Sequence, residues 1–196
     1  MKERLRNRVH IKMFTMEELC KKLENQDLIQ IIKELASSSP LNTSFFYSLV
    51  NSEEEEILEA NIFDELDQLK ICFDDRRKYD IWAGVLIQEK LHYIFRITEE
   101  MKRHQRYAGI GRIYKEISLL MIHFLNNSTE MDYETEQHMN QLVKDLSEWE
   151  SEDIPHDDML ILQEIFNDEE FFSQLDDFNY SEDFRNAISQ WYDTGL

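Results

Sequence analysis

The chain has 196 residues, a length typical of one domain with a sizeable core, or of two small domains that share one. It carries 41 acidic and 21 basic residues, and its net charge of −20 excludes generic nucleic-acid binding, because phosphates would be repelled over much of the surface. Four glycines and two prolines are too few for the turns of an all-β protein. No apolar run approaches the ~18 residues of a membrane helix, and no secretory signal is recognisable. We therefore expect a cytoplasmic protein without a membrane partner.

The N-terminal part of the chain predicts a basic arm and short helices. Residues 1–12 form the arm, and a capping box that begins at Thr15 starts a short helix. A second helix is expected over 27–36, where apolar residues recur at helical spacing. The face that they form carries Leu28, Ile31, Ile32 and Leu35. A further capping box at Ser52 and Glu55 starts a longer helix, which ends near residue 73.

The two longest apolar patterns lie in the middle of the chain. The longest predicted helix covers 79–106 and is apolar on two faces, which is typical of a central post buried on most sides. Gly109 and Gly111 are expected to form the turn after it. The next helix, over 110–126, has the cleanest apolar pattern in the sequence.

The last third predicts shorter helices. One is expected over 133–150, and another starts at Pro155 and ends near residue 167. An aromatic segment follows, and the run that begins at Ser181 is expected to cap the last helix. The sequence therefore predicts an all-α bundle of roughly eight to ten helices with no sheet. The polar break at 74–78 leaves open whether residues 1–196 form a single domain or an N-terminal lobe (13–74) and a C-terminal bundle (78–196).

The two cysteines carry no metal or disulfide pattern. Cys20 and Cys72 are too few for a disulfide framework or a zinc knuckle, and each lies in an apolar helical pattern. We expect both to be small buried residues in a reducing compartment.

Most of the negative charge lies at the C-terminal end. Residues 128–196 hold twenty acids against only Lys144 and Arg185. Large apolar side chains alternate with these acids, so we expect folded helices with a carboxylate outer face rather than a disordered acidic tail. Three interpretations stay open: a solvated face, a docking surface for a strongly basic partner, or a divalent-ion site.

The acids near aromatic residues are the candidates for docking a basic partner. The partner-binding candidates are Asp145, Glu148, Asp168, Glu169, Glu170, Phe171, Phe172, Asp176 and Asp177. At least one of the two adjacent phenylalanines is expected to pack inward, and the other would be an interface anchor. Long-range attraction should speed such association and weaken with salt.

A compact basic patch surrounds the expected turn at Gly109 and Gly111. It consists of Lys102, Arg103, His104, Arg106 and Arg112. Cations near the end of a helix interact favourably with its dipole, which is the simplest interpretation. A contact with the acidic third, within one chain or in a dimer, and a phosphate site are the alternatives.

No motif in the sequence completes a metal or catalytic site. Glu89 and His92 have the spacing found in di-iron bundles, but a second copy of the motif is missing. His92 and His123 lie in apolar helices and are expected to be core or boundary residues. His156 and its neighbouring acids would need further ligands, and residues 177–183 lack the glycine of a calcium loop. We therefore expect no metal, no cofactor and no catalytic residue.

The lack of a complete metal or catalytic motif, together with the strong negative charge, favours a non-catalytic protein-binding module. Such a module would be an inhibitor, immunity protein or antitoxin that blocks a basic, nucleic-acid-handling protein, with carboxylates in place of phosphates. A metal-dependent enzyme that uses acids and histidines of the C-terminal third is one alternative. A structural or adaptor subunit of a larger assembly is another. The sequence leaves homo-oligomerisation open.

Overall fold

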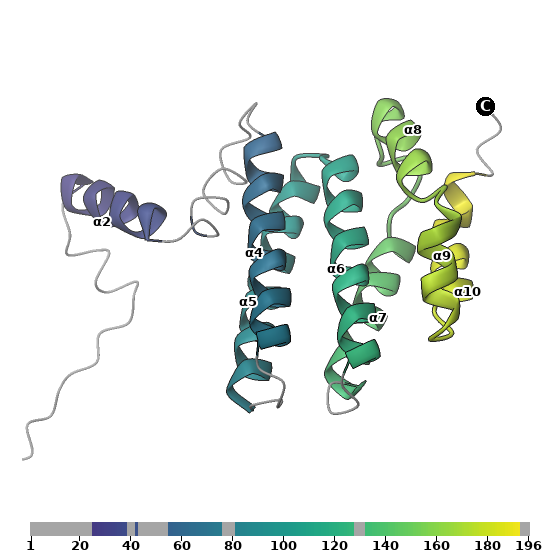
Figure 1. Ribbon diagram of the computed structural model, residues 1–196. Helices are drawn as coiled ribbons and strands as arrows, with labels where there is room; N and C mark the ends of the chain where they lie inside the picture. Colours follow the sequence, from purple (N-terminus) through teal and green to yellow (C-terminus); the bar gives the residue numbers. More distant parts are fainter. Residues whose placement is uncertain (1–24, 39–41, 43–54, 76–80, 128–131, 193–196) are drawn as a thin grey trace, which may run out of the picture.

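The computed structural model describes residues 25–38, 42, 55–75, 81–127 and 132–192 (Figure 1). Over these ranges the chain forms α-helices with one terminal 3-10 turn and no strand, which confirms the predicted all-α class. The longer helices run roughly parallel to one another in a bundle, and the shorter C-terminal helices lie at one end of it (Figure 1). None of the described helices is long and apolar enough to cross a membrane.

The helices follow one another in a simple order. They are α2 (Asn25–Ser37), α4 (Glu55–Asp75), α5 (Ile81–Arg103), α6 (Tyr107–Asn127), α7 (Asp132–Ser147), α8 (His156–Ile165), α9 (Glu169–Asp176) and α10 (Ser181–Ile188), followed by the 3-10 turn η2 (Ser189–Trp191). Each predicted helix that falls within the described ranges is present, with ends that differ by a few residues. The predicted helix near Thr15, the start of the capping box at Ser52 and the side chains of both cysteines lie outside what the structure describes.

The central post of the bundle is α6. It packs against α4, α5, α7, α8 and α9, and more than half of its 21 residues are buried. In contrast, α5 buries one side through residues such as Leu91 and Ile94 and exposes His92, Arg96 and Glu99 on the other. The prediction that the helix over 79–106 is buried on most sides was therefore wrong, since its outer side borders an open groove.

The turn between α5 and α6 does not use the two glycines. The chain reverses at 104–106, where Gln105 takes a left-handed conformation with φ of 56°. Gly109 and Gly111 lie inside α6, so the prediction that they form the turn was wrong. A Cβ at position 111 would lie 2.3 Å from Cδ2 of Leu162, so this glycine lets α8 approach α6 closely.

A side chain from α8 also caps the start of α6. The backbone N–H of Ala108 donates to Oδ2 of Asp158 over 2.9 Å. The first N–H groups of a helix have no partner within it, and a carboxylate there also meets the positive end of the helix dipole. Asp158 and Gly111 therefore hold α8 against the N-terminal end of α6.

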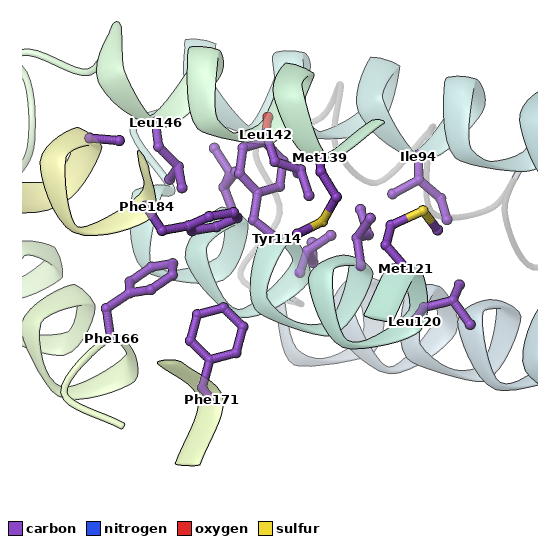
Figure 2. Close-up of a cluster of buried hydrophobic side chains, with 14 of the residues drawn as sticks. Ile94, Tyr114, Leu120, Met121, Met139, Leu142, Leu146, Phe166, Phe171 and Phe184 are labelled. Carbon is purple, nitrogen blue, oxygen red and sulfur yellow. The ribbon is translucent and has the colours of Figure 1, made fainter. Parts of the chain in front are cut away.

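The acidic third folds around aromatic side chains. Trp149 stacks on Trp191 with ring centroids 5.7 Å apart, and Phe166 contacts both Trp191 and Phe171. Figure 2 shows Phe166, Phe171 and Phe184 grouped on one side of Tyr114. Burial of such large side chains supplies the apolar area that a disordered acidic tail lacks, so the expected helices with apolar inner faces are present.

The starts of α9 and α10 differ in how they are capped. Asp168 is the N-cap of α9, and its side chain accepts from the backbone N–H groups of Glu170 and Phe171. Ser181 does not cap α10, because the N-cap position belongs to Tyr180 and no side chain bonds to the helix start there. The sequence had identified the last helix but assigned its cap to the wrong residue.

The apolar face predicted for the second helix is exposed in α2. Ile31 and Ile32 are 41% and 46% exposed, and Leu35 is half exposed. The C-terminal end of this helix is joined to α5 through Asn42, whose side chain donates to the backbone oxygen of Leu35 and accepts from the hydroxyl of Tyr93.

Candidate functional site

The C-terminal helices carry most of their carboxylates on the outside. The exposed acids from α7 to α10 and their connections are Glu136, Glu148, Glu150, Glu152, Asp153, Asp157, Glu164, Glu169, Glu170, Asp176, Asp177, Glu182 and Asp183. We call this set the acidic surface. Both bases of this third are engaged by acids, since Lys144 lies 3.7 Å from Glu148 and Arg185 lies 3.3 Å from Glu169. The charge on this part of the protein is therefore strongly negative.

The predicted docking acids divide into two groups on different helices. Asp145 lies in α7 and Glu148 directly follows that helix, whereas the acids at 168–177 belong to α9 and its ends. Within the second group, Glu169 and Glu170 are exposed, and so are Asp176 and Asp177 at the other end of the helix. Asp168 has a structural task, because it caps α9 and accepts from Nζ of Lys115 over 2.7 Å. The hydrogen bond from Lys115 lowers the pKa of Asp168.

Phe171 and Phe172 are both buried, each with about 1% of its surface exposed. Phe171 packs edge-to-face on Phe184, and the guanidinium of Arg185 lies over the ring of Phe172 at 3.9 Å from the centroid. The expectation that one of them packs inward is met, but neither ring is available as an exposed anchor. Phe172 is excluded from that role because the Arg185 side chain and the core cover it.

The predicted basic patch does not form one surface. Arg112 makes a two-pronged ion pair with the buried Glu59 of α4, at 2.6 and 2.7 Å, and Arg106 is buried. Arg103 is exposed and pairs with Glu100 within α5. Lys102 and Arg103 occupy the last turn of α5, as the helix-dipole interpretation requires, and His104 is half-buried in the turn. The side chains of Arg106 and Arg112 thus belong to the packing of the bundle.

A groove with a volume of about 410 Å³ lies between α5 and α7. Both helices pack on α6, which lies between them at the base. The residues that line the groove are His92, Phe95, Arg96 and Glu99 from α5, and Gln137, His138, Gln141 and Asp145 from α7. The rings of Phe95 and His138 stack across it with centroids 6.1 Å apart.

A buried hydroxyl supports the carboxylate at one end of the groove. Tyr114 of α6 donates from its hydroxyl to Oδ2 of Asp145 over 3.1 Å, and Gln141 donates to Oδ1 over 2.6 Å. Burial raises the pKa of Asp145, the two hydrogen bonds oppose this, and the nearby charges of Glu99 and Glu148 raise it further. The pKa of the Tyr114 hydroxyl lies well above its ordinary value, chiefly because of burial and then because of the Asp145 charge.

The predicted histidines lie apart from one another in the fold. His92 is exposed on the rim of the groove, whereas His123 is half-buried and contacts the ring of Phe73. His156 is exposed at the start of α8. Over the described ranges of the chain, no three histidine, cysteine or acidic side chains lie close enough together to hold a metal ion.

Sequence reasoning identified only one of the groove residues, Asp145, as a binding residue. The available signal was the spacing of His92, Arg96 and Glu99, which places polar side chains on one stripe of an otherwise apolar helix. That stripe predicts an exposed side of α5, but not that α7 would lie across from it.

A scan against protein-family models finds no family that matches the chain, and searches of curated proteins and of solved structures find no significant match.

Proposed function

We propose that this protein is a non-catalytic binding module whose acidic surface docks a strongly basic region of a partner protein. The observation that supports this function is the arrangement of the last third, where aromatic side chains fill the interior and carboxylates cover α7 to α10. Its two bases, Lys144 and Arg185, each lie beside a carboxylate of the same third.

The acidic surface lowers the stability of the free protein, and a basic partner would relieve that destabilisation. Like charges repel one another and destabilise the compact state, and they also create a field that speeds the approach of a cationic partner. A partner that handles nucleic acid carries cations spaced to meet phosphates, and carboxylates can take the place of those phosphates. The finer hypothesis is therefore an inhibitor, immunity protein or antitoxin that covers such a basic surface.

The test uses a fluorescein-labelled arginine nonapeptide as the probe for a basic partner. Its affinity is measured by fluorescence anisotropy at low and high salt for the wild type and for Glu169→Lys/Glu170→Lys. The matched control is Asp64→Lys/Asp67→Lys, which makes the same charge change on exposed positions of α4. Circular dichroism checks that both variants fold, since exposed charge changes rarely exceed about 0.5 kcal/mol in stability.

We expect the α9 reversal to weaken binding about tenfold more than the α4 reversal, with both effects reduced at high salt because screening shortens the reach of the field. Equal losses in the two variants would mean that the peptide responds only to net charge. That result would contradict the assignment of docking to the acidic surface.

A further inference from the structure

We infer that the groove between α5 and α7 accepts an arginine side chain of the basic partner, with its guanidinium between Glu99 and Asp145. This inference rests on the proposed function and deepens it, because it adds a specific anchor next to the acidic surface, whose Glu148 acts electrostatically on Asp145. The groove has the size of a small-ligand site at about 410 Å³.

The two carboxylates occupy the same end of the groove. Contacts at two levels show that α5 and α7 run in the same direction across α6. Phe95 of α5 stacks with His138 of α7. Further along both helices, one turn on in α5 and two turns on in α7, the Tyr114 hydroxyl of α6 lies 3.4 Å from Thr98 and hydrogen-bonds Asp145. Glu99 follows Thr98 directly, so it lies at the level of Asp145, and both residues line the groove.

Asp145 is held in place while part of its hydrogen-bonding capacity stays unused. Each of its oxygens accepts one hydrogen bond from the protein, Oδ2 from Tyr114 and Oδ1 from Gln141. A carboxylate offers about four acceptor positions, so roughly two remain for a ligand in the groove. Because the two donors hold the carboxylate in position, little freedom is lost when a ligand binds.

The electrostatics at this end favour a cation. Burial raises the pKa of Asp145, and the charges of Glu99 and Glu148 raise it further, so both neighbouring carboxylates oppose its ionisation. A guanidinium between Glu99 and Asp145 would offset both the repulsion and the lost hydration. Because Asp145 is half-buried, its attraction to a guanidinium is stronger than that of a fully exposed ion pair.

The other lining groups favour arginine over a metal ion or a lysine. Arg96 lies one turn before Glu99 and adds positive charge to the groove. A cation that relies on charge alone is therefore less favoured there than a group that also donates directed hydrogen bonds. A guanidinium is planar, donates in a fork to carboxylates and stacks on aromatic rings. Phe95, one turn before Glu99, provides such a ring in the groove lining, and it stacks with His138 at an angle of 23° between the ring planes.

The experiment uses Nα-acetyl-arginine amide as the probe and 15N NMR of the full chain as the readout. The reporters are the side-chain amides of Gln137 and Gln141, which line the groove. The neutral isostere acetyl-citrulline amide, acetyl-lysine amide and inorganic phosphate are titrated in parallel. The variant is Glu99→Gln/Asp145→Asn, which keeps the shape of both side chains and removes both negative charges, and the control is Glu152→Gln at an exposed position.

We expect the arginine probe to shift both amides saturably and to bind about tenfold more tightly than the citrulline probe, because only the guanidinium carries a charge. The lysine probe should bind more weakly than arginine. The double variant should lose the response, and Glu152→Gln should keep it. Equal responses to arginine and citrulline, shifts confined to other regions, or a stronger response to phosphate would each overturn the inference.

The nonapeptide assay separates failure of this inference from failure of the proposed function. If the double variant still binds the nonapeptide with full dependence on Glu169 and Glu170 while the groove amides do not respond, the groove inference fails and the acidic-surface proposal stands. If the groove responds to arginine but nonapeptide affinity is unaffected by the α9 reversal, the groove inference stands and the acidic-surface proposal fails.

Discussion

Gly111→Ala tests the close approach of α8 to α6, which helps to place α8 in the acidic third. In the structure, a Cβ at position 111 would lie 2.3 Å from Cδ2 of Leu162, well inside van der Waals contact. Leu162 is fully buried, and Ile165 and Phe166 also lie near that Cβ, so its side chain has little room to move away.

Two opposing effects determine how much Gly111→Ala changes the free energy of unfolding. Alanine is favoured over glycine in a helix interior by about 1 kcal/mol, which stabilises the variant. Inserting a methyl group into a well-packed core costs about 1–3 kcal/mol. We therefore expect a net loss of about 0–2 kcal/mol for Gly111→Ala in the wild-type background.

A second substitution separates the two effects. Leu162→Ala removes the clashing atom and by itself costs about 2–5 kcal/mol, because it leaves a cavity. In that background Gly111→Ala should stabilise by about 1 kcal/mol, since only the helix preference remains and the cavity is partly filled. The two residues should therefore show a coupling of about 1–3 kcal/mol in a double-mutant cycle.

The free energies of unfolding are measured by urea denaturation, followed by helical circular dichroism and by tryptophan fluorescence. Trp149 and Trp191 stack within the aromatic core, so fluorescence reports on the same region. If Gly111→Ala stabilises the protein equally with leucine or alanine at position 162, no clash exists and the close approach of α8 to α6 is wrong.

Two further predictions concern polar groups inside the bundle. Arg112→Ala should cost about 2 kcal/mol, because the buried Glu59 loses both of its short contacts, and Glu59→Leu/Arg112→Met should recover most of the loss in urea melts. A double variant no more stable than Arg112→Ala would contradict this account. The folded-state pKa of Asp145 is raised, so its ionisation lowers stability as pH rises above the ordinary value of 3.8. Asp145→Asn should therefore become progressively more stable relative to the wild type between about pH 4 and pH 7. A stability difference between variant and wild type that shrinks as pH rises would contradict the raised pKa of Asp145.

Local patterns in the sequence were sufficient for the fold class and for most of the helices. The apolar spacing over 110–126 predicted a helix with one strongly apolar face, and α6 is that helix, because such a face must pack against neighbours whatever their arrangement. Alternation of acids with large aromatic residues likewise predicted that the C-terminal third is folded. Both inferences depend on neighbours along one helix, and such neighbours are visible in the sequence.

Contacts between distant residues were decided only by the tertiary structure. In the sequence Gly111 resembles a turn residue, yet in the structure its missing side chain leaves room for Leu162, which lies 51 positions later. Asp158 caps a helix that begins far upstream, and Arg112 leaves the predicted basic patch to pair with Glu59. The spacing of charges along one chain does not show which distant group will neutralise them.

The groove likewise combines features that are visible within one helix and features that depend on contacts between helices. Its α5 wall was present in the sequence as a polar stripe, and Asp145 was identified on α7 as a docking acid. Only packing of both helices on α6 brought Glu99 and Asp145 to one end of a cavity and placed the Tyr114 hydroxyl beneath it. Periodicity determines which side of a helix is polar, but the choice of the facing helix depends on packing contacts among residues far apart in the chain.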